Sequence, residues 1–179
     1  EAKAFDHPLF GSMRRAHREW RQARNLDPGE GWPGERFVLL HSLSHALINE
    51  LAIECGYSSA SLSERIYSRG PGDGPEPMAG ILLYTSAPDA EGTLGGLVNL
   101  GQASELGPIL RRALERAGLC SSDPLCADHE PSAATSALHG AACHACLLVA
   151  ETSCERGNRY LDRSVLVDTF RHTGLELFP

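Results

Sequence analysis

The chain has 179 residues, of which 42 % are hydrophobic and 22 % are charged, and its formal net charge is −7. These values are typical of one globular domain, and they exclude a fibrous repeat and a fully disordered chain. No stretch approaches the roughly 20 apolar residues of a membrane-spanning helix, so we expect a cytoplasmic protein with no membrane partner.

The first expected element is a basic helix over residues 6–24, followed by a linker rich in proline and glycine up to residue 34. Between residues 14 and 24 there are five arginines and one glutamate, a local charge of +4, and the total of −7 then leaves −11 for the rest of the chain. Such an acidic domain binds nucleic acid poorly on its own, because phosphate affinity comes largely from lysine and arginine. We expect a solvated basic helix, with direct phosphate contact as the alternative.

The following elements predict an α+β fold in which helices pack around a small β-sheet. Apolar residues at steps of three and four indicate a buried helix from Phe37 to Leu51 that stops at Gly56. A short strand around residues 65–67 and a buried strand over residues 79–86 form the expected sheet.

A third expected helix begins at the capping residue Ser104 and stops at Gly118. The chain from 120 to 134 is expected to be irregular, and two further short helices are expected over residues 138–150 and 164–172.

Five of the six cysteines lie between residues 120 and 154, with the spacing C-x5-C-x16-C-x2-C-x7-C. The C-x2-C pair is the strongest sign of a metal, because this turn lets two thiolates meet one zinc ion at about 2.3 Å. Intracellular thiols are kept reduced, so disulfides are not expected. Redox-active cysteines and reduced core cysteines are the alternatives.

The pattern predicts a cysteine-rich C-terminal segment that binds Zn²⁺ through four thiols: Cys126, Cys143, Cys146 and Cys154. Cys120 is the reserve ligand, because it can replace Cys126 if the loop folds the other way. Three histidines are weaker substitutes for a cysteine: His129, His139 and His144. Cys55 is expected to be a small core residue. Four thiolates leave no open coordination position, so the site is expected to be structural rather than catalytic.

His41 and His45 lie four residues apart and therefore on one face of the second helix. A zinc protease would need glutamate at position 42, where Ser42 stands instead. Structural hydrogen bonding, a contact to a partner or nucleic acid, and metal binding remain open for this pair. A hydrolase in which one of them activates a serine or a zinc-bound water is the least favoured function, because only the presence of suitable residue types points to it.

Four polar residues follow the last cysteine, so a bound zinc ion would fix their direction in space: Arg156, Asn158, Arg159 and Arg163. They are a possible contact to a partner or to nucleic acid. The alternative is a helix N-terminus that Asn158 caps.

The run from Cys143 through Cys146 and Cys154 to Gly157-Asn158 and Leu161-Asp162 resembles the ending of the zinc-binding domain that follows MrfA-type DNA-repair helicases. Further matching stretches lie at residues 40–48, 55–62, 80–84 and 92–96, so that the resemblance covers about residues 35–170. The chain is most similar to the DrmB-like branch, from the DISARM anti-phage system. It departs from the helicase version in its leading cysteine, which there lies closer to the C-x2-C pair.

The resemblance implies a non-catalytic module that supports a superfamily-2 helicase or translocase. The implied partners are a helicase subunit or an adjoining helicase domain, with DNA reached through the complex. The chain itself has no G-x4-G-K-[ST] phosphate loop. A domain that binds nucleic acid directly is the alternative.

The expected organisation is an N-terminal basic helix and linker over residues 1–34 and a zinc-binding, helicase-associated domain with one core over residues 35–179. Because the chain opens at Glu1 without a methionine, we expect it to be a fragment of a longer protein.

Overall fold

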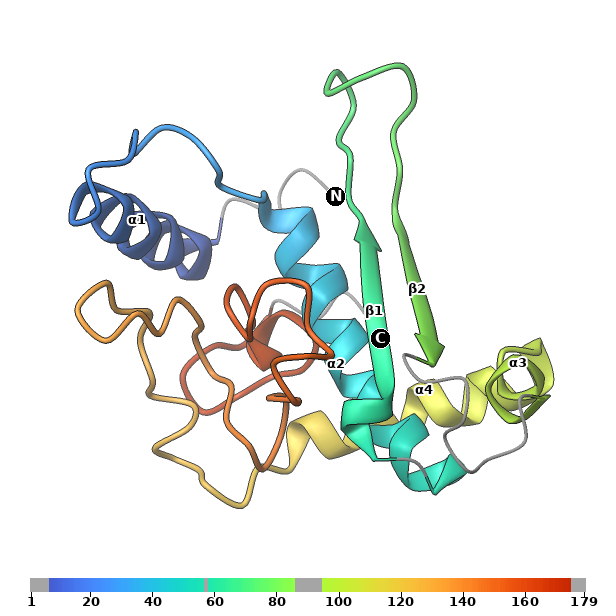
Figure 1. The fold of residues 1–179 in the computed structure, drawn as a ribbon. Coiled ribbons are helices and arrows are strands. Elements are labelled where there is room, and N and C mark those ends of the chain that lie inside the picture. The colour runs from blue at the N-terminus through green and yellow to red at the C-terminus, as the bar shows by residue number, and fades with distance from the viewer. Residues whose placement is uncertain (1–6, 57, 86–94, 175–179) are drawn as a thin grey trace.

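The computed structural model describes residues 7–56, 58–85 and 95–174 (Figure 1). Its helices are α1 (Pro8–Gln22), α2 (Glu35–Cys55), α3 (Gly95–Leu100) and α4 (Ala103–Gly118), and its strands are β1 (Leu62–Tyr67) and β2 (Gly80–Thr85). Two short 3-10 turns cover Ser59–Ser61 and Arg163–Val165. The expected α+β class is confirmed. Over the described ranges, no helix has the length and apolar character needed to cross a membrane.

The central element is α2, which contacts both strands, α3, α4 and the two 3-10 turns. Figure 1 shows it between the β-ribbon and the irregular C-terminal chain. It ends at Gly56 as expected, where φ is 67°, a left-handed conformation that glycine adopts without steric strain. Its buried residues surround the helix instead of forming one apolar stripe, and they include polar side chains. The polar ones in the middle of the helix are His41, Ser42, Ser44 and His45.

The two strands form an antiparallel ribbon whose register runs from Leu62 opposite Thr85 to Tyr67 opposite Gly80. Strand β2 was expected to be buried, but Leu82 and Tyr84 are 48 % and 45 % exposed. The physical reason is that a two-stranded ribbon has only one covered face, so alternate side chains of β2 point to solvent. Ser86, the last residue of the expected strand, lies outside the described residues.

Between Leu119 and Gly174 the described chain has no α-helix, and its only bridge pairs Ser132 with Ala137. The short helices expected over residues 138–150 and 164–172 are therefore wrong, apart from the 3-10 turn. Backbone hydrogen bonds between distant residues hold the segment, for example from Gly140 N to Leu161 O at 2.8 Å. A Cβ atom at Gly140 would lie 1.8 Å from Asp162 Oδ2, so only glycine fits this close approach.

Helix α1 packs on the same hydrophobic cluster as the other elements, through Leu9, Phe10 and Met13. Its buried His17 lies 2.9 Å from the Tyr160 hydroxyl through Nδ1 and 2.9 Å from the Glu30 carbonyl oxygen through Nε2. The hydrophobic core therefore contains residues from both sides of position 34, where the N-terminal helix and linker were expected to end.

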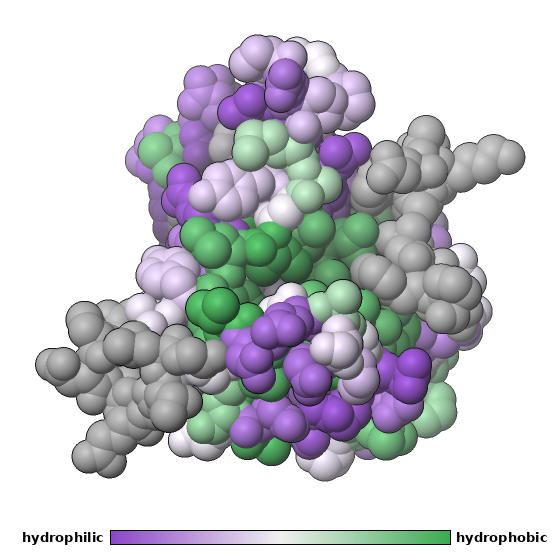
Figure 2. All heavy atoms as spheres, turned by 90° about the vertical axis from the view of Figure 1, so that its right-hand side faces the viewer, coloured by the Kyte–Doolittle hydropathy of each residue, from purple (hydrophilic) through white to green (hydrophobic). Residues whose placement is uncertain are grey.

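An apolar groove lies on the face shown in Figure 2, where the surface is green between two hydrophilic regions. It has a volume of about 270 Å³ and is lined by side chains of α2, β2 and α3: Leu47, Leu51, Ile81, Leu83, Leu97 and Leu100. Nearby on this surface, Val98 is 78 % exposed. The domain thus presents apolar surface to its surroundings.

A buried carboxylate joins α2 to α4. The Glu50 side chain is 3 % exposed, and its two oxygens accept hydrogen bonds from Arg112 Nε at 2.7 Å and Arg116 Nε at 3.1 Å. Burial alone would raise the pKa of Glu50, but the two guanidinium groups hold it below its usual value. Glu54, by contrast, is 45 % exposed, and its pair with Arg112 lies at the surface.

Replacing Glu50 with Gln should lower the free energy of unfolding by about 1–3 kcal/mol, because two charge-assisted hydrogen bonds are weakened in a covered position. Urea denaturation at neutral pH measures this change. The matched control Glu54→Gln should change stability by about 0.5 kcal/mol or less, because exposed ion pairs contribute little. Equal effects of the two substitutions would contradict this description of the α2–α4 contact.

Candidate metal centre

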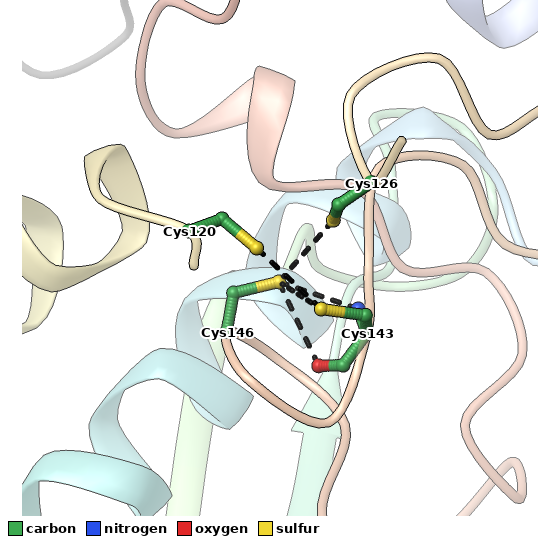
Figure 3. A group of neighbouring side chains, drawn as sticks. All are labelled: Cys120, Cys126, Cys143 and Cys146. Atoms are coloured by element: carbon green, nitrogen blue, oxygen red, sulfur yellow. Dashed lines mark hydrogen bonds between the residues drawn. The ribbon is translucent and has the colours of Figure 1, made fainter. Parts of the chain in front are cut away.

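Four cysteines from the end of α4 and from the irregular segment meet at one point: Cys120, Cys126, Cys143 and Cys146 (Figure 3). The sulfur of Cys120 lies 3.5 Å from that of Cys143, and the sulfur of Cys126 lies 3.6 Å from that of Cys146. The two sulfurs of the C-x2-C turn are 3.7 Å apart. We call these four residues the tetracysteine group.

The sulfur separations fit a tetrahedral zinc site. Four sulfurs at about 2.3 Å from one ion lie about 3.8 Å from one another, close to the spacings observed. A disulfide would require about 2.05 Å, and the six cysteines are free thiols. The residues present therefore fit Zn²⁺, and four thiolates would fill its coordination sphere.

The chain around the tetracysteine group turns so that backbone N–H groups face the sulfurs. Cys143 N donates to Cys146 Sγ at 3.3 Å, and Ser122 N donates to Cys120 Sγ at 3.4 Å. The turn itself is closed by a hydrogen bond from Cys146 N to Cys143 O at 3.1 Å. Hydrogen bonds to sulfur favour the thiolate form that binds metal.

A buried arginine holds the loop that carries Cys120 and Cys126. Arg163 is fully buried, donates to Ala117 O at 2.9 Å and pairs with the carboxylate of Asp123. Burial lowers the pKa of Arg163, but Asp123 and the thiol of Cys126 raise it by more. The pKa therefore lies above its usual value, and the guanidinium keeps its charge. The arginine therefore connects the end of α4 to the cysteine loop.

The thiols titrate over a wide range in this setting. Burial raises the pKa of Cys126 to about 12, and it also raises the pKa of Cys146. Burial raises the pKa of Cys143 too, but the backbone N–H of Ala145 and the neighbouring thiols lower it to about 7. Two of the four sulfurs therefore hold their protons near neutral pH until a metal displaces them.

The structure groups the cysteines differently from the expected ligand set. Cys120, the reserve ligand, lies in the tetracysteine group, whereas Cys154 lies in a separate group with His41, His45 and Glu64. Cys126 and the C-x2-C pair lie where they were expected.

The other candidate ligands lie outside both groups. His129 and His139 stack on each other with ring centroids 4.6 Å apart, and His144 is exposed. Cys55 is half-buried near the end of α2.

Burial corrects the expected contact role of three residues. His41, His45 and Arg163 have no exposed surface, because the core encloses all three, so they have no surface that a partner or nucleic acid can touch. Asn158 is engaged internally, since its side chain bonds both the N–H and the carbonyl of Val149. It lies in an irregular turn and caps no helix.

Arg156 and Arg159, the remaining members of that set, lie beside aromatic rings. The Arg156 guanidinium is 5.4 Å from the centre of the Phe37 ring, and that of Arg159 is 5.5 Å from the centre of the Trp20 ring. Arg156 is exposed and Arg159 is half-buried.

Glu64 is the group that the sequence analysis missed. In the strand β1, Leu62, Ser63, Glu64 and Ile66 are buried, whereas Arg65 and Tyr67 are exposed. The period of two places the carboxylate of Glu64 on the same covered face as Leu62 and Ile66, where a charge is unusual without a partner. The signal available in the sequence was the position of Glu64 two residues from each of these apolar residues.

Comparison with known proteins agrees with this geometry. Residues 43–147 match the family described as the MrfA Zn-binding domain. The chain is also similar to the DISARM protein DrmB of Bacillus paralicheniformis, at 52 % identity over 133 residues, which is 74 % of this chain and 22 % of that protein. The chain thus spans less than a quarter of the relative's length. The family match and the tetracysteine group confirm the expectation of Zn²⁺.

Zinc affinity should rise steeply with pH. If the tetracysteine group binds the ion, at least two protons must leave Cys126 and Cys146, so the apparent association constant should increase at least about 100-fold per pH unit below neutrality. Competition with a coloured chelator between pH 6 and pH 7 measures this slope. An affinity that does not change over this range would show that the buried thiols are not the groups that bind zinc.

Proposed function

Because the chain belongs to the MrfA Zn-binding domain family, we propose that it is a non-catalytic, zinc-stabilised module that docks on a superfamily-2 helicase or translocase and supports it on DNA. The system would be an anti-phage defence or DNA-processing complex, as the similarity to a DISARM protein supports. The observation that carries the proposal is the tetracysteine group, which joins the end of α4 to the irregular C-terminal third.

The proposed ligands of the zinc ion are the members of the tetracysteine group. These sulfurs have the spacing of a tetrahedral site, whereas the sulfur of Cys154 faces a different set of groups. Zinc held by four thiolates supplies structural stability and has no position for a substrate or an activated water. The chain's own part is to present the sulfurs from two loops, while Arg163, paired with Asp123, holds the loop that carries Cys120 and Cys126.

The surroundings of the two histidines favour a scaffold over a hydrolase. Both rings are enclosed, and the serine between them already accepts a hydrogen bond from Asp162 N at 3.0 Å through its hydroxyl oxygen. A nucleophile needs access to its substrate, and Ser42 is fully buried. These groups are placed to hold the core together.

The apolar groove between β2, α2 and α3 also supports contact with another protein. Contiguous exposed apolar surface of this kind commonly marks an interaction site. Leu82, Tyr84 and Val98 add exposed apolar side chains on β2 and α3.

Loss of zinc should abolish helicase binding. The double variant Cys143→Ser/Cys146→Ser should lose the tetracysteine zinc. The amount of helicase subunit that co-purifies with it should fall by about tenfold or more, because metal-binding free energy here is folding free energy. The matched control Cys55→Ser should keep both the zinc and the helicase, since Cys55 lies outside both groups. Full retention of the helicase by the zinc-free double variant contradicts the proposal.

Direct contact with DNA is the second candidate function, and one observation favours it. The exposed Arg24, two residues after α1, and Arg159 of the C-terminal segment both lie over the ring of Trp20, at 4.2 and 5.5 Å from its centre. Two separate parts of the chain thus bring positive charge to one place, where phosphate groups could be neutralised.

This second function predicts that Arg159→Ala weakens binding to short duplex DNA and reduces the slope of log K against log salt by about 1. Fluorescence anisotropy at several salt concentrations measures both. Arg111→Ala on the exposed side of α4 is the control and should leave the slope unchanged. If the chain binds no DNA at low salt, direct contact is rejected and DNA is reached through the helicase alone.

A further inference from the structure

A second set of metal-binding side chains lies in the core, away from the tetracysteine group. His41 and His45 come from α2, Glu64 from β1 and Cys154 from the C-terminal segment, and their four ligand atoms all lie within 4.8 Å of one another. The side chains of the two histidines and of Glu64 are 0 % exposed, and Cys154 is also buried. We call these residues the histidine group.

The ring nitrogens of both histidines are arranged as in metal sites. His45 Nδ1 lies 2.9 Å from the Leu147 carbonyl oxygen, and His41 Nδ1 lies 3.4 Å from that of Tyr160. A carbonyl oxygen can only accept, so each Nδ1 carries the proton. The neutral ring then has its lone pair on Nε2. A backbone carbonyl that fixes the tautomer in this way is the usual partner of a metal-bound histidine.

Both Nε2 atoms face the two acidic groups. His41 Nε2 lies 2.9 Å from Glu64 Oε1 and 3.1 Å from Cys154 Sγ, and His45 Nε2 lies 3.3 Å from Glu64 Oε1. Nitrogen and oxygen ligands at about 2.0–2.1 Å from a tetrahedral ion are about 3.3 Å apart. The His45 distance has this value, and the others require separations only a few tenths of an ångström larger.

Two buried atoms in the histidine group, His45 Nε2 and Glu64 Oε2, have no hydrogen-bond partner among the residues that the structure describes. A buried polar atom without a partner destabilises a fold by about 1–3 kcal/mol. One cation at the centre of the group would be coordinated by the lone pair of His45 Nε2 and would neutralise the charge of Glu64.

The charges of the histidine group also match a divalent ion. A carboxylate and a thiolate carry two negative charges, and two neutral imidazoles add none, so a 2+ ion makes the enclosed group neutral. The thiolate is prepared by the backbone, since Asn158 N and Arg156 N donate to Cys154 Sγ at 3.1 and 3.4 Å. Nitrogen, sulfur and oxygen ligands in one tetrahedral set suit zinc.

We propose that His41, His45, Glu64 and Cys154 hold a second zinc ion, which joins α2 and β1 to the C-terminal segment. Four ligands close its coordination sphere, so the ion is structural. It is independent of the proposed helicase contact. It would connect three parts of the chain that lie far apart in the sequence.

In the alternative state without a metal ion, hydrogen bonds and ion pairs hold the same four side chains together. Burial lowers the pKa of His45, but the neighbouring Cys154 and Glu64 raise it to about 9, so the ring can also carry a positive charge. A buried ion cluster of this kind would contain no metal. The two states differ in the number and position of bound zinc ions, so both must be measured.

The first measurement is the zinc content of the purified 179-residue chain by mass spectrometry of the elements. We expect two zinc ions per chain. X-ray absorption at the zinc edge should show five sulfur ligands shared between two ions, with nitrogen and oxygen completing the shells. Anomalous diffraction should place one ion within the tetracysteine group and one within the histidine group. One ion per chain, bound only by sulfur, overturns the proposal.

Single substitutions then assign the second ion. His45→Ala and Cys154→Ser should each lower the content from two zinc ions to one and leave an all-sulfur absorption spectrum. The matched controls His144→Ala and Cys55→Ser should keep two ions, because both residues lie outside the two groups. Retention of two ions by both folded variants contradicts the assignment. If a variant fails to fold, the ion count and the anomalous map of the unmodified chain still decide.

Discussion

Zinc bound by the tetracysteine group, as proposed, would stabilise the C-terminal third, which has almost no regular secondary structure of its own. Between Leu119 and Gly174 the described chain contains one 3-10 turn and one isolated bridge. Such a segment lacks the repeated backbone hydrogen bonds that stabilise helices and sheets, and fixing each residue costs about 1–2 kcal/mol in backbone entropy. Zinc at the tetracysteine group would restrict the two loops that carry the sulfurs, and Arg163 connects the loop of Cys120 and Cys126 to α4. The proposed site therefore predicts that the folding of this segment is coupled to zinc binding.

Helix α2 is the rigid support on which this segment rests. Its Asn49 side chain donates to the Cys146 carbonyl at 3.2 Å, and His45 bonds the next carbonyl, that of Leu147. The chain that leaves the C-x2-C turn is therefore held directly against the polar face of α2. A second ion at the histidine group, as proposed, would hold β1 to the same helix. The polar face of α2 thus lies against β1 and the C-terminal segment. For this reason its histidines are more buried than several of its leucines.

The helices with clear periodicity and the two strands could be predicted from the sequence, because their signals are local. Gly56 stops α2 and Gly118 ends α4 as expected. The prediction of a helix over residues 138–150 was wrong, because Cys143 and Cys146 lie in a tight turn that brings their sulfurs together. The partners of Cys154 could not be predicted, since His41 lies 113 residues away in the sequence and Glu64 belongs to a strand. The cysteine spacing indicates a zinc site but does not determine which sulfurs meet in the fold.

The most direct test of this account is hydrogen exchange of the 179-residue chain with zinc bound and with zinc removed by a chelator. Amides of residues 120–165 are expected to exchange at least about 100-fold faster without zinc, because the turns at the tetracysteine group open. Amides in the middle of α4, which pack on apolar residues, should keep more of their protection. Equal exchange of residues 120–165 in the two states would contradict the claim that zinc orders the C-terminal third.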